Sequence, residues 1–237
     1  DWSWSRGLGD VYKRQVIVKG KGIHIFDSDG NKMIDGPAGM WCMQTGYGRK
    51  EIADAVSKQI LSLSYATSFT LINDKETELA KRISEQTPGD FNRIYFTTGG
   101  STAVDSALRL CQLANNIKGA RNKKQIITRE KAYHGSTYLS ASVTGKERDK
   151  TAMDIKREGI HFLKAPCHFY YPEFDNEDDF CDFLINELEE KIIEIGPENI
   201  MAFIAEPILA SGGVIVPPKN YNYRCWEVVK RYNIIYI

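Results

Sequence analysis

Apolar residues recur along the chain at two spacings, and segments of each kind follow one another in turn. Apolar positions three or four residues apart predict helices, at 52–63, 75–85, 101–117, 176–195 and 221–232. Short runs rich in β-branched and aromatic residues predict strands, at 22–27, 33–35, 93–97, 125–128, 200–205 and 234–237. Asp29 and Gly30, between the first two strands, are typical of a hairpin turn. From residue 93 onward strands alternate with helices, so we predict an α/β fold with a mostly parallel sheet flanked by helices.

Segments with polar and small residues follow three of the predicted strands. They read "TTGGST" at 97–102, "REKAYHGST" at 129–137 and "AEPILASGG" at 205–213. A parallel sheet binds its ligands at the carboxyl ends of its strands, so these segments are expected to share one site. Together they offer a cradle for a phosphate, an aromatic ring beside an imidazole, and a carboxylate.

The junction at 97–102 has the features of an anion site. Gly99 and Gly100 let the backbone approach a bulky group, and the hydroxyls of Ser101 and Thr102 add donors. A helix start leaves backbone N–H groups unpaired and carries partial positive charge, which favours a phosphate. An ordinary strand–helix turn capped by Ser101 explains the same residues, so the junction alone leaves both interpretations open.

Composition excludes some partners. Lys and Arg total 31, as do Asp and Glu, so the chain has no net charge to direct it to nucleic acid or to a membrane surface. Its five cysteines are scattered without C-x-x-C spacing, which fits a reducing, cytoplasmic setting. No apolar run approaches the length of a transmembrane helix.

Two further segments are set aside. His161, Cys167 and His168 lack the paired spacing of structural zinc sites, and no fourth ligand is evident, so no metal site is predicted. Residues 1–15 show neither periodicity nor a targeting pattern. We interpret them as a leader of artificial origin that does not belong to the fold.

Four ordered motifs carry a resemblance to a known family. "GMWCMQTGYGRKEIADAVSKQ", "FTTGGSTAVDSALRL", "AYHGSTYLSASVTG" and "FIAEPILASGGVIVPPKNY" resemble the class III aminotransferases, pyridoxal-phosphate enzymes of fold type I. The similarity is greatest to the branch that uses ω-amino acids or amines with pyruvate, and it covers 16–237. The resemblance implies that 16–66 form the N-terminal segment of a small domain and 67–237 a cofactor-binding large domain.

The resemblance also implies roles for particular residues. The cofactor-binding residues it indicates are Gly100, Ser101, Thr102, Tyr133, His134 and Glu206. The first three match the phosphate-binding helix start, Tyr133 matches the residue that stacks on the pyridine ring with His134 beside it, and Glu206 matches a carboxylate near the ring. The family usually has Glu at position 102 and Asn at 104, where this chain has Thr102 and Val104.

The resemblance further indicates the substrate class. Trp41 matches an aromatic residue of the substrate pocket in the ω-amine branch, and Ser211 stands where ornithine and γ-aminobutyrate enzymes commonly carry a glutamate. We expect an ω-amino acid or amine donor, with pyruvate as the keto acid acceptor. The alternative is a non-catalytic or nucleotide-phosphate-binding α/β module, although "GGSTAV" lacks the G-x-G-x-x-G spacing of a dinucleotide site.

The same resemblance leads us to expect a homodimer and a chain that is a fragment of a longer protein. Family members are homodimers, so we expect the stretch 39–70, with Trp41, Tyr47, Tyr65 and Phe69, to contact a second copy. In the family, the aspartate at the pyridine nitrogen and the Schiff-base lysine follow the segment that resembles 234–237. We therefore expect the large domain to be truncated and the catalytic lysine to be absent, which would leave the fragment inactive.

Overall fold

The computed structural model describes residues 15–67, 69–152 and 154–237. The predicted leader, 1–15, lies outside the described residues except for Gln15. The chain divides into two compact units, with the boundary in the sequence between Ile94 and Tyr95. The domain boundary expected at 66/67 from the family resemblance stays a prediction.

The described residues of the N-terminal unit form a small antiparallel sheet and three helices. Its strands are β1 (Ile17–Lys21), β2 (His24–Asp27) and β3 (Lys32–Ile34), in the order β1-β2-β3. The hairpin predicted at Asp29–Gly30 is confirmed between β2 and β3. The Asp27 carboxylate fixes this turn because it accepts hydrogen bonds from the backbone N–H groups of Asp29 and Asn31, at 3.0 and 2.8 Å.

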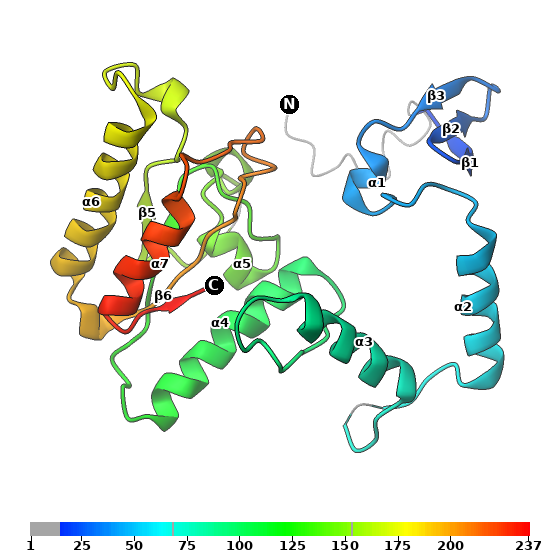
Figure 1. Ribbon diagram of the computed structural model, residues 1–237, viewed down its shortest axis with the longest axis horizontal. Coiled ribbons are helices and arrows are strands. Elements are labelled where there is room, and N and C mark those ends of the chain that lie inside the picture. The colour runs from blue at the N-terminus through cyan, green and yellow to red at the C-terminus, as the bar shows by residue number, and fades with distance from the viewer. Residues whose placement is uncertain (1–14, 68, 153) are drawn as a thin grey trace. The chain divides into compact units, whose positions relative to one another are not determined.

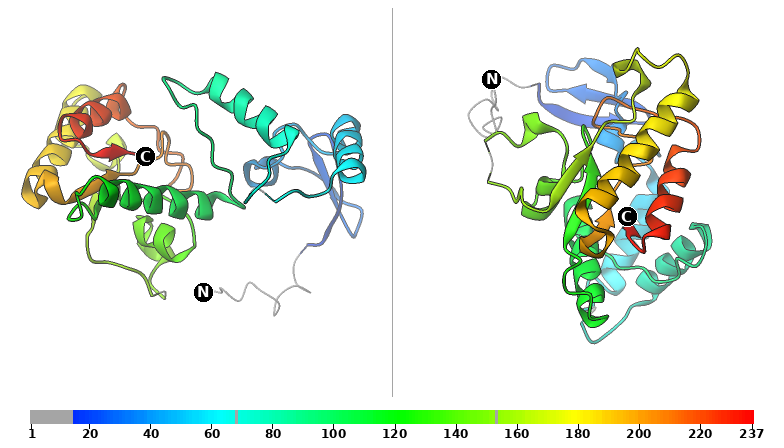
Figure 2. Two further views of the ribbon diagram at one scale, coloured as in Figure 1. Left: turned by 90° about the horizontal axis from the view of Figure 1, so that it is seen from below. Right: turned by 90° about the vertical axis from the view of Figure 1, so that its left-hand side faces the viewer.

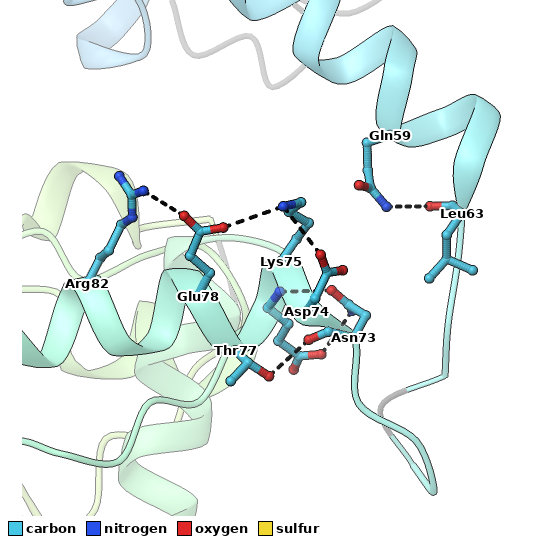
Figure 3. A network of polar contacts seen from close by, with 9 residues as sticks. Gln59, Leu63, Asn73, Asp74, Lys75, Thr77, Glu78 and Arg82 are labelled. Carbon is cyan, nitrogen blue, oxygen red and sulfur yellow. Dashed lines mark hydrogen bonds and ion pairs between the residues drawn. The ribbon is translucent and has the colours of Figure 1, made fainter.

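The helices of this unit are α1 (Ala38–Trp41), α2 (Lys50–Ser62) and α3 (Asp74–Gln86). Asn73 caps α3, since its side-chain oxygen accepts from the N–H of Glu76 at 2.8 Å. Figure 3 shows this start of α3 and the Lys75–Glu78–Arg82 ion pairs along its surface. Neither α2 nor α3 contains a buried residue, so both present their apolar positions at the surface of the unit.

The C-terminal unit is built on a four-stranded parallel sheet. Figure 1 labels two of its strands, β5 and β6, and the helices α4 to α7 of the same unit. Its strands are β4 (Gln125–Arg129), β5 (Ile160–Leu163), β6 (Ile200–Phe203) and β7 (Ile235–Tyr236), in the order β5-β4-β6-β7. Its helices are α4 (Gly100–Ile117), α5 (Tyr138–Val143), α6 (Glu177–Ile195) and α7 (Tyr221–Arg231). Short 3-10 turns lie at Glu147–Asp149, His168–Tyr170 and Pro197–Asn199. The predicted mostly parallel sheet is confirmed.

Alternate side chains of each strand enter different cores, so both faces of the sheet are covered. Ile127 and Phe203 pack with α6 and α7, whose apolar residues include Leu188 and Val228. Ile126 and Ala202 point the other way and pack with α4 and α5. The right-hand view of Figure 2 shows α6 and α7 side by side. This three-layer arrangement buries all four residues of β6, as the continuous apolar run of that strand requires.

One predicted strand does not form. Among the described residues, 93–97 have no strand conformation, although α4 follows at Gly100 as expected. Tyr95 is 71% exposed, so its ring gains little from burial here. A strand needs a neighbour to accept its backbone hydrogen bonds, and no strand of the sheet pairs with these residues. The glycine junction therefore follows an irregular segment rather than a strand.

In the part of the chain that the structure describes, no helix combines the length and apolar character needed to cross a bilayer.

Candidate functional site

The site lies in the C-terminal unit, where the start of α4 and the loops after β4 and β6 come together. The loop after β4 is bonded to both of the others. Ser136 donates its N–H to Ser101 Oγ at 3.0 Å, and Tyr133 donates its N–H to Glu206 Oε1 at 2.8 Å. The structure thus joins the three polar segments that the sequence analysis grouped.

The start of α4 has the backbone donors of an anion site. Gly99 is the N-cap, and the first hydrogen bond of the helix runs from the N–H of Ala103 to the carbonyl of Gly99 at 2.9 Å. The backbone N–H groups before Ala103, in the first turn of the helix, have no helical carbonyl to bond, so they can bind an acceptor outside the helix. A Cβ built on Gly99 or Gly100 would meet no atom within 4 Å, so there is open space beside them. Thr102 Oγ1 donates to the carbonyl of Gly99 at 2.8 Å and closes the turn.

Gly135 permits the loop after β4 to lie against this helix start. A Cβ at position 135 would come within 2.6 Å of Ser101 Oγ and 2.9 Å of Ser101 Cα. Gly135 also has φ of 135°, which side chains disfavour. The contact is completed by Thr137 Oγ1, which donates to the carbonyl of Ser101 at 3.4 Å. Only glycine allows this close approach with this backbone conformation.

The Glu206 carboxylate links the two loops. One oxygen accepts from Tyr133 and the other accepts from the N–H of Ala210 at 3.2 Å. Because Ala210 belongs to the loop after β6, the carboxylate fixes that loop and the Tyr133 backbone with one side chain. The site assignment from the family resemblance left the role of Glu206 open, and this geometry gives it a positioning role.

The Tyr133 ring is held at the edge of the site. Its hydroxyl lies 3.1 Å from Ser136 Oγ, and the residue remains 40% exposed. Lys146 Nζ lies 5.6 Å from the ring centroid, within the range of a cation–π contact. An aromatic side chain that is restrained at its hydroxyl yet partly open to solvent can still receive another ring against it.

His134 is buried in the loop after β4, and its predicted contact with the cofactor stays a prediction. It is 8% exposed, and its Nε2 lies 3.2 Å from Thr128 Oγ1. The Thr128 hydroxyl donates to the carbonyl of Val143, so Nε2 carries the proton and donates to Thr128. Burial, followed by the charge of Arg129, lowers the pKa of His134 from 6.5 to about 4. A neutral His134 therefore supports the loop from behind.

Arg129, at the end of β4, is a buried residue that sequence reasoning missed. Its Nη2 donates to the backbone carbonyl of Glu206, and its guanidinium carbon lies 5.5 Å from the Tyr221 ring centroid. Within the described residues, its Nε and Nη1 have no hydrogen-bond partner. A charged residue at the end of a short strand that contains Ile126 and Ile127 was the available signal. Its partners could not be found, because Glu206 is 77 positions away.

Trp41 belongs to the N-terminal unit. It is 55% exposed and has φ of 66° in the irregular helix α1. Its predicted contribution to the substrate pocket stays a prediction. In the described ranges, no group of three or more His, Cys, Asp or Glu side chains could hold a metal ion.

The chain matches known proteins over almost its whole length. A family model described as Aminotransferase class-III matches residues 9–237, a range that begins inside the predicted leader. The putrescine–pyruvate aminotransferase of Pseudomonas aeruginosa is 38% identical over 226 residues, covering 94% of this chain and 49% of that protein. The mitochondrial γ-aminobutyrate transaminase 1 of Oryza sativa subsp. indica is 38% identical over 226 residues, covering 94% of this chain and 44% of that protein.

A solved structure gives the same result for the fold. The ω-transaminase of Pseudomonas jessenii, in complex with PMP, has a TM-score of 0.91 and 33% sequence identity, covering 94% of this chain and 50% of that one. The chain spans about half the length of the curated relatives it matches.

Proposed function

The chain belongs to the class-III aminotransferase family, and from this premise we propose that the complete protein transfers an amino group from an ω-amino acid or amine to a keto acid, with pyruvate as the acceptor. One observation carries the proposal. The helix start, the Tyr133 loop and the Glu206 carboxylate meet at the ligand-binding end of a parallel sheet. The names of two relatives support the substrate class, since one includes putrescine and pyruvate and the other γ-aminobutyrate.

Pyridoxal phosphate is the cofactor of this family, and the residues of the site fit it. The open space beside Gly99 and Gly100 lies at the start of α4, where the backbone N–H groups of a first helical turn are available to a phosphate. The partly exposed Tyr133 ring leaves room for an aromatic ring. We assign the phosphate to Gly100, Ser101 and Thr102 and the pyridine ring to Tyr133.

When bound, the cofactor supplies an electron-withdrawing ring that allows a proton to leave the amine-bearing carbon of the substrate. The chain supplies binding and orientation. The dipole of α4 favours the phosphate, and Thr102, where the family usually has Glu, avoids a negative charge beside it. Tyr133 covers one side of the ring and excludes water there, while Glu206 fixes the Tyr133 backbone. We propose that the catalytic lysine of the complete protein lies outside residues 1–237.

Two broader features belong to the same proposal. A homodimer is supported by the exposed apolar positions of α2, among them Ile52, Val56 and Ile60. A cytoplasmic location is supported by the five cysteines, all of which are free thiols.

An assay of the complete protein tests the function. We expect amino transfer from β-alanine, putrescine and a simple arylalkylamine to pyruvate, together with a visible absorbance band that shifts when the amine is added. If the protein uses only 2-oxoglutarate as the amino acceptor, the proposal that pyruvate is the acceptor is wrong. Protein that acquires no absorbance band from pyridoxal phosphate would instead support a phosphate-binding module without this chemistry.

A further inference from the structure

Arg129 is a buried cation at the carboxyl end of β4, next to the loops of the candidate site. Its side chain is fully enclosed, with 0% exposure. Nη2 donates to the backbone carbonyl of Glu206, whereas Nε and Nη1 have no hydrogen-bond partner among the described residues. Burying a charge costs free energy that one hydrogen bond to a neutral carbonyl does not recover. Stability alone therefore does not account for an arginine at this position.

Contacts on several sides fix the position of Arg129. Its backbone pairs with β5, where it stands opposite Leu163. Its guanidinium carbon lies 5.5 Å from the ring centroid of Tyr221, which is itself buried at the start of α7. A Cβ on Gly145 would come within 2.0 Å of the Arg129 carbonyl oxygen, so the segment after α5 packs directly on this end of β4. The guanidinium therefore has little freedom to move, and the group that it bonds is held in turn.

Glu206 is bonded to Arg129 at one end and to the Tyr133 loop at the other. Its backbone carbonyl accepts from Arg129, and its carboxylate accepts the N–H groups of Tyr133 and Ala210 at 2.8 and 3.2 Å. A charged donor makes a stronger hydrogen bond to a carbonyl than a neutral donor does. Glu206 thus connects the rigid end of β4 to Tyr133, which stands four positions further along the same loop.

We propose that Arg129 is a positioning residue of the cofactor site, which holds Glu206 in place so that Tyr133 is fixed for the pyridine ring. The inference rests on the proposed function, which assigns the pyridine ring to Tyr133. Because Arg129 is fully enclosed, it acts through Glu206 and does not touch the cofactor.

The affinity of the complete protein for pyridoxal phosphate, measured by equilibrium dialysis, tests the proposal. Arg129→Met removes the charge and the donors and should raise the dissociation constant about tenfold, the usual effect of losing a hydrogen bond from a charged group. Arg129→Lys keeps the charge and one donor group, so its dissociation constant should lie between those of the wild type and Arg129→Met. An unchanged dissociation constant in Arg129→Met would overturn the proposal.

Lys123→Met is the matched control. Lys123 is also a buried cation that donates to a backbone carbonyl, with Nζ 2.7 Å from the carbonyl oxygen of Asn233. Lys123 precedes β4 and Asn233 precedes β7, so this hydrogen bond lies at the opposite end of the parallel sheet. Lys123→Met should leave the affinity for pyridoxal phosphate unchanged. An equal loss of affinity in both variants would show that Arg129 contributes only general stability.

A double variant tests whether Arg129 acts through Glu206. Glu206→Gln alone should raise the dissociation constant about fivefold, since one hydrogen bond of the carboxylate is lost. Combined with Arg129→Met, it should raise the constant about tenfold, no more than Arg129→Met does alone. Independent effects would instead multiply to about fiftyfold, and that result would show that Arg129 does not act through Glu206.

Amide hydrogen exchange of the cofactor-free complete protein separates the inference from the function. The N–H groups of Tyr133 and Ala210 should exchange faster in Arg129→Met than in the wild type or Lys123→Met, because their acceptor is no longer held. If this difference is found in a protein that transfers no amino group, the proposed function fails and the positioning of Tyr133 by Arg129 remains. If transfer occurs but both groups exchange equally in the three proteins, the positioning role is wrong and the function remains.

Discussion

At the scale of single residues, the site depends on groups that touch the backbone of its loops. The Glu206 carboxylate accepts N–H groups from Tyr133 and Ala210, and Ser101 Oγ accepts the N–H of Ser136. Hydrogen bonds of this kind fix where a loop lies, since they act on its main chain. The orientation of the Tyr133 ring therefore depends on a side chain 73 positions away.

Glu206→Gln should weaken cofactor binding. Glutamine keeps one oxygen but places an amide donor where the second acceptor stood, so Tyr133 or Ala210 loses its hydrogen bond. A loss of about 1 kcal/mol corresponds to an increase of about fivefold in the dissociation constant of pyridoxal phosphate. Equilibrium dialysis of the complete protein measures it, with Glu190→Gln on the exposed side of α6 as the charge-matched control. Equal affinity in all three proteins would show that other contacts hold Tyr133.

His134 should make the fold sensitive to acid. Its pKa is about 4 in the folded protein and 6.5 when unfolded, so between pH 6.5 and 4 only the unfolded chain binds the proton. Stability is complete above pH 6.5 and falls as the pH is lowered through this window, by on the order of 3 kcal/mol from this group. Urea unfolding of wild type and His134→Gln checks it, because the difference between their pH profiles isolates the imidazole. Parallel profiles would contradict the prediction.

At the scale of elements, periodic segments were predictable and short ones were not. The predicted helices at 101–117, 176–195 and 221–232 agree with α4, α6 and α7 within one or two residues, because each has a long apolar face. Strands β1 and β5 and helices α1 and α5 were not predicted. Helix α5 has only six residues, too few to show a period, and begins at a capping box between Thr137 and Ser140.

The candidate site shows the same contrast between residues that a local pattern predicts and residues that only distant contacts bring together. Gly100, Ser101, Thr102, Tyr133 and Glu206 were named from the sequence, and the structure joins their loops. His134 was named with them and is buried, and its role beside the cofactor stays a prediction. Lys146 was not named, because its neighbour Ser211 is 65 positions away and nothing local in the sequence relates the two. Contacts between distant loops depend on how the strands are ordered, which local patterns do not contain.

Gly135→Ala should separate the Tyr133 loop from α4. The added methyl group meets Ser101 and must also adopt φ of 135°, so we expect a loss of about 2–3 kcal/mol or a displaced loop. Gly119→Ala is the control, since Gly119 also has positive φ, at 79°, but no atom within 4 Å of a new Cβ. Denaturant unfolding of the complete protein should show the larger loss for position 135. A smaller loss there than at 119 would mean that the close approach is dispensable.

At the scale of the whole molecule, the N-terminal unit exposes apolar residues within the stretch that we predict to contact a second copy. Tyr65 and Phe69, in the predicted contact stretch 39–70, are 78% and 93% exposed. Tyr47, from the same stretch, instead packs on Gly20 and donates its hydroxyl to Asp35 at 2.6 Å. The predicted contact therefore has to rely on the other residues of this stretch and on α2.

Val56→Glu should convert the proposed dimer into a monomer. Val56 is 52% exposed on α2, which has no buried residue, so the charge disturbs an interface rather than a core. Sedimentation velocity of the complete protein at micromolar concentration measures the change. Lys58→Glu, on the opposite face of the same helix, should remain dimeric. A monomeric wild type would remove the basis for the dimer.

During synthesis on the ribosome, the loop contacts of the site become possible one after the other. Ser101 and Ser136 are 35 positions apart, whereas Tyr133 and Glu206 are 73 apart. At roughly 5–20 residues per second, Glu206 is added about 4–15 s after Tyr133. For that interval the nascent chain has a phosphate cradle whose aromatic side is not yet fixed. We therefore expect cofactor capture on the ribosome to begin at the phosphate end, and protease protection of residues 130–137 in arrested chains to increase only once Ala210 has left the exit tunnel.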